Sequence, residues 1–370
     1  MKNRKLLVYY NDKLVGTLAL SKNFDIYFQY DNDWIINGFS INPFSLPLTN
    51  EVFTSKKPYF DGLFGVFADS LPDSWGRLLL ERYLKKNNIL DLNVLDRLAI
   101  ISSSAMGALE YKPEYTLNIN SSNLTLDEIA KECMNILLNE SSDNLDEIFK
   151  LGGSSGGARP KILTKIDNED WIIKFNNHLD MKEIGLMEYE YSLCAKKCGI
   201  NIPKTKLFES NSCKGYFGIK RFDRDNGKKI HMISAAALLE IDYRSPALDY
   251  NQLMKLTKIL TNNTEDVIEL FRRMCFNVFA HNRDDHAKNF SYIYDEEKKV
   301  YRLSPAYDLT YSTTYYGEHT TSINNNGKNP TDEDLLAVGK NAGICKEKCI
   351  DIIKTVKENV NQYLNKYIKA

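Results

Sequence analysis

The sequence predicts an α+β fold in which a small accessory domain precedes a core of two lobes, the second mostly helical. Three observations predict it. Short runs of alternating apolar residues fill residues 5–60, which is typical of strands. A glycine-rich stretch at 152–157 introduces further strand patterns, and from about Ser234 the apolar residues recur mostly at helical spacing. We therefore divide the chain into an accessory domain, a glycine-rich β-containing lobe and a helical lobe, at residues 1–111, 112–233 and 234–370.

The accessory domain is predicted to begin with a hairpin and to end with helices. Alternating apolar residues indicate strands at 6–10, 14–20, 24–30 and 34–36. From Asp73 the spacing becomes helical, and a second helical pattern covers 93–101.

The middle lobe is predicted to contain two helices before its strands. A polar linker at 118–123 precedes a helix at 125–139, which Thr125 and Glu128 would begin as a capping box. A short helix then ends near Lys150. The later elements are expected to be strands at 161–166 and 171–175, a helix at 181–198, and strands at 202–203, 206–208 and 216–222.

The last lobe is predicted to be helical except for a hairpin at 289–303 and a polar loop at 312–330. The helix before the hairpin is strongly amphipathic, through residues such as Val267, Phe271 and Met274, so the loop that follows it should be anchored to a packed core. The apolar positions of a final helix, 345–367, suit either a docking surface or core packing.

The overall composition limits the classes of partner. Lys and Arg number 48 against 49 Asp and Glu, a formal net charge of -1, so no global basic field exists for non-specific binding to nucleic acid. The seven cysteines lack Cys-x-x-Cys spacing, which predicts free thiols and a reducing cytoplasm. No apolar run reaches the roughly 20 residues of a membrane span, so we expect no membrane partner.

The first candidate functional segment is the glycine-rich loop. Small residues let backbone N–H groups approach phosphate oxygens closely. The segment fails the P-loop pattern, because Ala158 stands where Lys is required, and it contains no Gly-x-Gly-x-x-Gly, so a flexible linker is an equal alternative. The candidate nucleotide-binding residues are Gly152, Gly153, Ser154, Ser155, Gly156 and Gly157.

Lys174 ends the apolar strand that follows the glycine loop. This is the placement of the kinase lysine that holds the α- and β-phosphates, although a strand lysine can also simply face solvent. Kinases pair this lysine with a carboxylate on the next helix. Glu188 and Glu190 are both available on different helix faces, so at most one of them can serve.

The most specific segment runs from Asn282 to Asn289. The kinase catalytic loop is written His-Arg-Asp-x-x-x-x-Asn, and here Arg283, Asp284 and Asn289 fit it, with Asn282 in place of His. After the predicted hairpin comes Asp308, where kinases place a second metal-binding Asp, followed here by Leu rather than Phe-Gly. Four such segments in this order predict an ATP phosphotransferase with a protein-kinase-like (PI3/4-kinase-like) two-lobed core.

In combination, these segments resemble the HipA-type kinases of toxin–antitoxin modules over nearly the whole chain. The segments that carry the resemblance are 71–77, 96–99, 107–110, 154–161, 220–224, 284–291 and 305–309. The resemblance implies a serine/threonine protein kinase of the bacterial cytoplasm that uses ATP and Mg²⁺. Its implied site residues are Asp284 as catalytic base, Asn289 and Asp308 as Mg²⁺ ligands, Lys174 on the phosphates, and the backbone of Lys220 and Phe222 on adenine.

Three loop residues have two interpretations each. His286 either belongs to the nucleotide-binding set or hydrogen-bonds the loop in place of the missing kinase histidine. Lys288 either contacts the transferred phosphate in catalysis or is solvated. Asp285 stands where a small residue is expected, and is either an extra carboxylate near the metals or a solvated loop residue.

The resemblance also implies regulation and partners. Autophosphorylation in the glycine loop would fall on Ser154 or Ser155, with Ser154 favoured by position. A phosphoserine adds a charge of about -2, and each like-charge pair at about 4 Å costs roughly 4 kcal/mol at an effective dielectric constant of about 20, so the loop should swing out. The implied partners are a HipB-like helix-turn-helix antitoxin, operator DNA reached only through it, and a protein substrate such as an aminoacyl-tRNA synthetase.

Two alternatives stay open. One is a catalytically silent pseudokinase that represses transcription together with a helix-turn-helix antitoxin, against which the intact set of Asp284, Asn289 and Asp308 argues. The other is a small-molecule or lipid kinase with the same fold.

Overall fold

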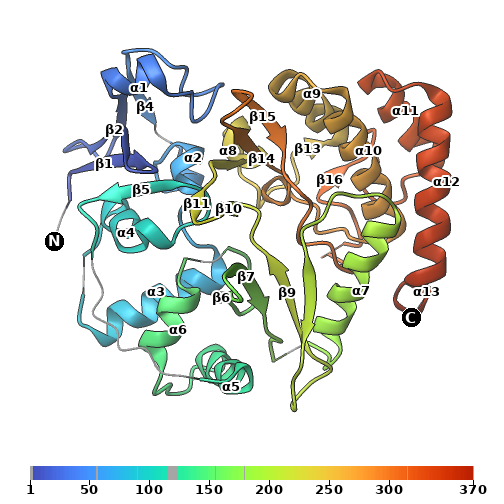
Figure 1. Cartoon of the computed structure of the whole chain (residues 1–370), viewed down its shortest axis with the longest axis horizontal. Coiled ribbons are helices and arrows are strands. Elements are labelled where there is room, and N and C mark those ends of the chain that lie inside the picture. The colour runs from blue at the N-terminus through green and yellow to red at the C-terminus, as the bar shows by residue number, and fades with distance from the viewer. Residues whose placement is uncertain are drawn as a thin grey trace. The chain divides into compact units, whose positions relative to one another are not determined.

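The computed structural model describes residues 3–55, 57–89, 91–115, 124–154, 156–178, 180–314 and 316–369. The chain divides into two compact units, which are described separately. Figure 1 labels the helices and strands. Unit 1 comprises Met1–Gly185, Lys206–Ile233 and Ala237–Glu240, and unit 2 comprises Leu186–Thr205, Ser234–Ala236 and Ile241–Ala370. The three-part division of the sequence stays a prediction, and the predicted polar linker at 118–123 lies outside the described residues.

The first sheet of unit 1 is antiparallel, with strand order β4-β3-β2-β1-β5. Its strands are β1 (Lys5–Tyr10), β2 (Lys13–Leu20), β3 (Ile26–Tyr30), β4 (Val52–Ser55) and β5 (Leu109–Lys112). Asn11 and Asp12 link β1 to β2 with φ values of 43° and 66°, the left-handed pair that matches the twist of a tight hairpin. The predicted hairpin is confirmed.

The helical elements that accompany this sheet outnumber the two helices that the sequence predicted. The helical elements are α1 (Asn32–Asn37), η1 (Pro58–Phe60), α2 (Gly65–Ala68), α3 (Ser74–Lys86), α4 (Val94–Ile101) and η2 (Ser102–Ser104). The predicted strand at 34–36 is wrong, because the Asp31 side chain accepts a hydrogen bond from the Asp33 N–H and begins α1 there. The two helices predicted from Asp73 and at 93–101 are confirmed.

A second sheet, with strand order β6-β7-β9-β8, follows the glycine-rich stretch. Its strands are β6 (Lys161–Ile166), β7 (Glu169–Lys174), β8 (Thr205–Phe208) and β9 (Tyr216–Lys220), and a small ribbon of β10 (Arg224–Asp225) and β11 (Lys228–Lys229) comes next. The β6–β7 hairpin is confirmed. The predicted strand at 202–203 is wrong: Pro203 lacks the N–H that a ladder needs, and the chain there is irregular.

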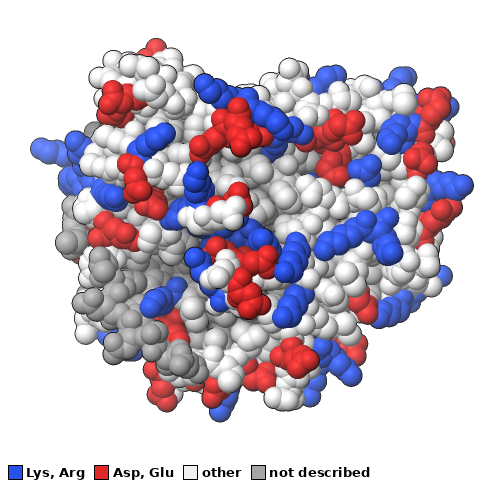
Figure 2. All heavy atoms as spheres, viewed as in Figure 1, with Lys and Arg blue, Asp and Glu red and all other residues white. Residues whose placement is uncertain are grey.

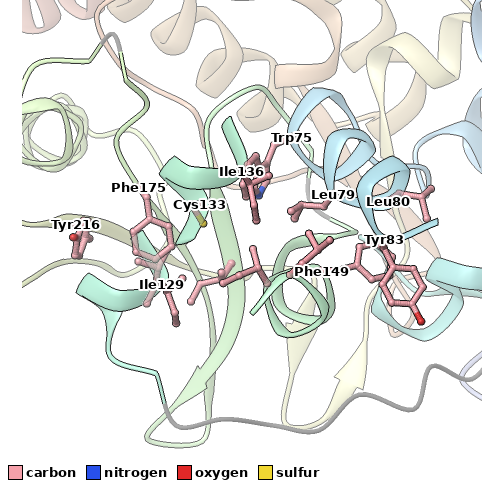
Figure 3. Close-up of a cluster of buried hydrophobic side chains, with 14 of the residues drawn as sticks. Trp75, Leu79, Leu80, Tyr83, Ile129, Cys133, Ile136, Phe149, Phe175 and Tyr216 are labelled. Carbon is pink, nitrogen blue, oxygen red and sulfur yellow. The ribbon is translucent and has the colours of Figure 1, made fainter. Parts of the chain in front are cut away.

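One hydrophobic core of unit 1 joins α3 to the second sheet and to two helices, α5 (Leu126–Leu137) and α6 (Leu145–Gly152). Figure 3 shows side chains of this cluster, and the rings of Tyr83 and Phe149 stack with centroids 4.6 Å apart. Its labelled members are Trp75, Leu79, Leu80, Tyr83, Ile129, Cys133, Ile136, Phe149, Phe175 and Tyr216. The cluster draws residues from both sides of position 111, so α3 packs with the middle part of the chain.

Two sets of hydrogen bonds fix the first turn of α5. Thr125 and Glu128 form the predicted capping box. Asp127 beside them accepts hydrogen bonds from the hydroxyls of Ser210 and Tyr216, each at 2.7 Å, and from the Asn211 N–H at 3.0 Å. The Asn211 N–H and these hydroxyls lower the pKa of Asp127 to about 2. Asp127 therefore ties the helix to the loop between β8 and β9.

Unit 2 is mostly helical, as predicted. Its helices, with those that lead into it, are α7 (Ile184–Lys197), α8 (Ala235–Leu239), α9 (Tyr250–Thr261), α10 (Thr264–Phe279), η3 (Ala287–Asn289), α11 (Asp332–Ala342), α12 (Lys346–Tyr363) and α13 (Asn365–Ile368). Its strands are β13 (Leu248–Asp249), β14 (Ser291–Asp295), β15 (Val300–Leu303) and β16 (Thr321–Ser322), whereas β12 (Met232–Ser234) begins in the last residues of the Lys206–Ile233 segment of unit 1. The predicted hairpin is β14–β15.

The core of unit 2 is built around α10. Val267, Phe271 and Met274 are buried, as the amphipathic pattern predicts. α12 runs alongside α10 and α11 (Figure 1) and buries Ile352 and Val356, so core packing accounts for the apolar face of this helix. The seven cysteines are free thiols. Within the described ranges, no helix combines the length and the apolar character needed to cross a membrane.

We expect the hydrogen bonds of the Asp127 carboxylate to make the folding stability of the protein depend on pH in the acidic range. The carboxylate has a pKa of about 2 in the folded chain, against 3.8 ordinarily, so its contribution is complete above about pH 4 and is lost as the pH falls towards about 2. The thermal midpoint of Asp127→Asn should therefore lie below that of the wild type at neutral pH. The difference between the two midpoints should shrink as the pH falls towards about 2. The exposed Asp143→Asn serves as control. A difference in midpoint that stays constant with pH would contradict a stabilising role of the ionised Asp127 carboxylate.

Candidate functional site

The segment predicted to be the catalytic loop joins α10 to β14 and turns two neighbouring carboxylates in opposite directions. The Asp284 side chain is 60% exposed, whereas that of Asp285 is 0% exposed. The loop therefore presents Asp284 to solvent, as a proton acceptor for an incoming hydroxyl requires.

The two predicted metal ligands lie on segments that are bonded to each other. The Asn289 amide nitrogen donates to the backbone oxygen of Asp284 at 2.7 Å, which leaves the amide oxygen to act as a ligand. The Tyr307 hydroxyl, next to Asp308, donates to the backbone oxygen of Lys288 at 2.7 Å. Asp308 itself has a φ of 52°, a left-handed conformation that Asp adopts more readily than most residues. The structure thus connects the 288–289 and 307–308 segments.

An amide oxygen and a carboxylate are hard ligands of the kind that Mg²⁺ takes. This ion is usually held by one or two protein carboxylates and keeps further sites for water and phosphate oxygens. In the part of the chain that the structure describes, no three His, Cys, Asp or Glu side chains form a group that could hold a metal ion by themselves. A cation at Asn289 and Asp308 would therefore complete its coordination with water or with phosphate oxygens.

Asp285 is an internal anchor. Its carboxylate accepts hydrogen bonds from the Tyr250 hydroxyl at 2.9 Å, from His319 Nδ1 at 2.9 Å and from the Thr321 N–H at 3.1 Å. The interpretation of Asp285 as a solvated loop residue is wrong, and the carboxylate is engaged with the protein rather than held open as an extra metal ligand. The sequence could not show this, because the donors come from α9 and from residues 319–321.

His286 and Lys288 both pack on Tyr243. The His286 and Tyr243 ring centroids are 5.3 Å apart, and Lys288 Nζ lies 4.7 Å from the centroid of the Tyr243 ring, a cation–π contact. His286 Nδ1 is buried and has no hydrogen-bond partner among the described residues, and His286 Nε2 lies 3.9 Å from Asp284 Oδ1. The anchoring role of His286 stays a prediction. Sequence reasoning missed Tyr243; an aromatic residue within a polar loop was the available signal. The nucleotide contact of His286 and the phosphate contact of Lys288 stay predictions.

In unit 1, the glycine-rich loop begins later than the sequence predicts. α6 runs through Gly152 and is capped by Gly153. A Cβ on Gly152 would lie 2.5 Å from the Lys161 backbone oxygen, so glycine lets this helix approach β6. Gly152 and Gly153 thus have a packing role in the structure, and their contacts with nucleotide stay predictions.

The remaining loop is held by the start of α3 and by β6. The Asp73 carboxylate accepts a hydrogen bond from the Gly157 N–H at 3.2 Å, and the Trp75 N–H donates to the Gly157 oxygen at 3.1 Å. Lys161 Nζ donates to the Gly156 oxygen. The loop is therefore tethered by residues of a segment far earlier in the chain, which no spacing within the loop could reveal.

Ser154, the favoured phosphorylation site, is buried. Its hydroxyl donates to the Ser104 backbone oxygen at 2.8 Å. The other candidate, Ser155, lies outside the described residues. A kinase could reach Ser154 only after this hydrogen bond breaks and the loop moves.

Lys174 is the last residue of β7, and its Nζ lies 5.7 Å from the centroid of the Phe217 ring. Of its two candidate partners on α7, Glu190 is already engaged: it accepts from Lys366 at 2.6 Å and from the Tyr367 hydroxyl at 2.7 Å. Glu188 is buried. Which of the two carboxylates pairs with Lys174 stays a prediction.

A buried ion cluster fixes the segment after β9 that would hold adenine. Asp223 pairs with Arg221 at 2.7 Å and with Arg224 at 2.9 Å, and accepts from the Gly107 N–H at 2.8 Å. Burial alone would raise the pKa of Asp223, but the two guanidinium groups outweigh it and lower the pKa to about 2. Arg224 also donates to the oxygens of Ala105 and Gly107, so the accessory part of the chain braces this segment. The adenine contacts of Lys220 and Phe222 stay predictions.

The charged side chains do not form one large basic field on the face shown in Figure 2. Lys and Arg stand among Asp and Glu across the atoms drawn there. This pattern agrees with the formal net charge of -1.

Two family models match the chain: the HipA N-terminal domain over residues 6–112 and the HipA-like C-terminal domain over residues 153–364. The protein therefore belongs to the HipA family. The resemblance found in its sequence motifs is confirmed.

Two curated relatives come from Sinorhizobium fredii. "Putative kinase Y4mE" is 26% identical over 351 residues, covering 85% of this chain and 79% of that protein. "Putative kinase Y4dM" is 29% identical over 170 residues, covering 42% of this chain and 40% of that protein. The match thus spans well under half the length of the second relative.

Among solved structures, the chain is similar to one from the "Shewanella oneidensis MR-1 Toxin Antitoxin System HipA, HipB and its operator DNA complex". The TM-score is 0.73 at 18% identity, over 98% of this chain and 91% of that chain. At this identity the likeness establishes the fold, and it confirms the predicted α+β, kinase-like two-lobed architecture.

Loss of the Asp223 carboxylate should strongly destabilise the protein. Asp223→Ala leaves the guanidinium groups of Arg221 and Arg224 buried without their anion, which typically costs about 3–5 kcal/mol. Urea unfolding should show this loss, whereas Asp225→Ala, at an exposed position two residues later, should change the free energy of unfolding by less than about 0.5 kcal/mol. Equal effects of the two substitutions would show that the cluster does not stabilise the chain.

Proposed function

We propose that this protein is an ATP- and Mg²⁺-dependent serine/threonine protein kinase that acts as the toxin of a toxin–antitoxin module. One observation carries the proposal: an exposed carboxylate, Asp284, sits on the same loop as the candidate ligand Asn289, and this loop is bonded to the segment that bears the other candidate ligand, Asp308. Membership of the HipA family and relatives that are named as kinases support it.

In the proposed reaction, the residues of the chain mainly position the reactants and stabilise charge, as in other phosphoryl transfers. Asp284 accepts the proton of the attacking hydroxyl while the new O–P bond forms and the bond to the ADP oxygen breaks. Mg²⁺, when bound, neutralises charge on the phosphates. Asn289 and Asp308 hold it through their side-chain oxygens.

The remaining residues in this proposal bind the phosphates or hold the adenine base. Lys174 binds the α- and β-phosphates. Lys288, held over the Tyr243 ring, steadies the transferred phosphate. The backbone of Lys220 and Phe222 holds adenine, on the segment that the Asp223 cluster fixes.

The proposed partners follow from the Shewanella structure and from charge. That structure contains HipB and operator DNA beside HipA. By analogy, this protein would bind a HipB-like helix-turn-helix antitoxin. Because the chain has a formal net charge of -1, it would reach DNA only through that partner. The proposed substrate is a protein hydroxyl of the translation machinery, such as one on an aminoacyl-tRNA synthetase.

The Asp284→Asn variant tests the proposed activity. With labelled ATP, Mg²⁺ and a bacterial lysate, the wild type should label itself or a lysate protein. Asp284→Asn should transfer phosphate about 10²–10⁴-fold more slowly, because the general base is lost, while binding ATP as before. Glu297→Gln, in the exposed turn between β14 and β15, should behave as the wild type.

Three outcomes would reject or change this proposal. Wild-type protein that binds nucleotide but labels nothing would be a pseudokinase acting with its antitoxin. Labelling confined to low-mass compounds of the lysate would indicate a small-molecule kinase. Equal labelling by the wild type and Asp284→Asn would remove Asp284 from the mechanism.

We further propose that Ser154 accepts phosphate in an autoinhibitory step. Its hydroxyl must first leave the Ser104 oxygen, so the modified loop should be displaced and the affinity for ATP should fall. Mass spectrometry after incubation with ATP should locate the phosphate on Ser154, and Ser154→Ala should remove it. Limited proteolysis should cut the phosphorylated loop faster than the unmodified loop. Loss of the phosphate in Ser155→Ala instead would assign the acceptor to Ser155.

A further inference from the structure

A continuous chain of hydrogen bonds runs behind the catalytic loop within unit 2. Asn282, which replaces the kinase histidine, donates from its amide to the Asn277 side-chain oxygen at 2.9 Å. The Asn277 amide donates to the Tyr250 hydroxyl at 2.9 Å, and that hydroxyl donates to the Asp285 carboxylate at 2.9 Å. All four residues are buried. Asn282 is thus linked to Asp285 through Asn277 of α10 and Tyr250 of α9.

The loop at 319–321 also bonds to Asp285, at the end of this series of hydrogen bonds. His319 Nδ1 lies 2.9 Å from the Asp285 carboxylate, and the His319 side chain is only 2% exposed. Because a carboxylate accepts hydrogen bonds and does not donate them, Nδ1 carries the proton. The Thr321 N–H donates to the carboxylate at 3.1 Å, and the Thr321 hydroxyl donates to the Asp285 backbone oxygen at 2.6 Å.

The same loop also holds the residue on the other side of Asp284. The N–H and the hydroxyl of Thr320 donate to the Arg283 backbone oxygen at 3.0 Å and 3.1 Å. Asp284 therefore lies between two anchored residues: its neighbours Arg283 and Asp285 are both bonded to residues 319–321, and Asp284 is the most exposed of the three.

We propose that Asp285 and His319 are positioning residues for Asp284, and that this buried pair does the work of the histidine missing at position 282. The proposal rests on the proposed kinase function. Asp285 draws the backbone inward on one side of Asp284, and the loop at 319–321 fixes the other side, so the Asp284 carboxylate is held at one place relative to Asn289. A displacement of about 1 Å in such a group can reduce the rate about 100-fold.

A positioning role for Asp285 and His319 predicts which kinetic constant changes when either residue is substituted. Most of the proposed nucleotide contacts, including Lys174 and the segment after β9, belong to unit 1. Loosening the Asp285 anchor should therefore lower kcat and leave the KM for ATP within about threefold, since the interaction is made with the reacting group rather than with the bound nucleotide. A defect in folding would instead reduce the amount of active enzyme, which active-site titration measures.

The experiment compares substitutions of the pair. Asp285→Asn keeps the size of the side chain but lacks one acceptor oxygen, and His319→Leu removes the donor; each should lower kcat about 10–100-fold. His319→Asn places an amide nitrogen near the position of Nδ1 and should restore most of the rate. The Asp285→Asn/His319→Leu double variant should be little slower than either single variant, because one interaction is broken in all three.

Hydrogen exchange provides a readout that does not require activity. Amides of residues 283–289 should exchange at least about tenfold faster in Asp285→Asn than in the wild type, as expected when a local unit opens more easily. Val356→Ala serves as the control for general stability: it removes buried volume in α12 and should lower the thermal midpoint without changing exchange at 283–289 or kcat.

Two results would overturn the proposal. One is unchanged exchange at 283–289 in Asp285→Asn. The other is failure of His319→Asn to exceed His319→Leu in kcat. If the wild type itself transfers no phosphate, the proposed kinase function fails, and the exchange measurement alone still decides whether the pair holds the Asp284 segment in place.

Discussion

A buried carboxylate without hydrogen-bond donors would be intolerable, and the candidate site is organised around meeting that requirement at Asp285. Three donors from Tyr250, His319 and Thr321 surround the carboxylate. Once these contacts form, the loop between α10 and β14 has little freedom, and the adjacent Asp284 is left facing solvent. The exposed acid and its buried neighbour are thus two consequences of one constraint.

The same arrangement recurs in unit 1. Asp223 gathers Arg221, Arg224 and the Gly107 N–H, and Asp127 gathers the loop between β8 and β9. In each case an acidic side chain joins segments far apart in the sequence, and the low pKa reports how strongly the surroundings favour its charged form. Asp223 thereby holds the segment after β9 that is proposed to bind adenine, and it would not itself touch the nucleotide.

At the positions where this chain departs from the usual kinase pattern, the structure shows what the substituted residues contact or where they are buried. Asn282 stands in place of histidine and joins a buried hydrogen-bond chain instead of supporting the loop directly. Leu309 replaces the usual Phe-Gly and is buried. The Asp308 segment is attached through Tyr307 to the backbone of Lys288. The motif changed at several positions, yet the candidate ligands still lie on segments that are bonded together.

The sequence by itself determined the features that depend on near neighbours: the hairpins, the capped start of α5, the amphipathic α10 and the order of the functional segments. These follow from periodicity, turn residues and caps, which act over a few residues. Only the tertiary structure decided which carboxylate is buried, which glycine serves packing, and which aromatic ring supports Lys288. The residues concerned are Asp285, Gly152 and Tyr243. Each of these outcomes depends on partners far away in the chain, and no local pattern records where a distant segment will fold back.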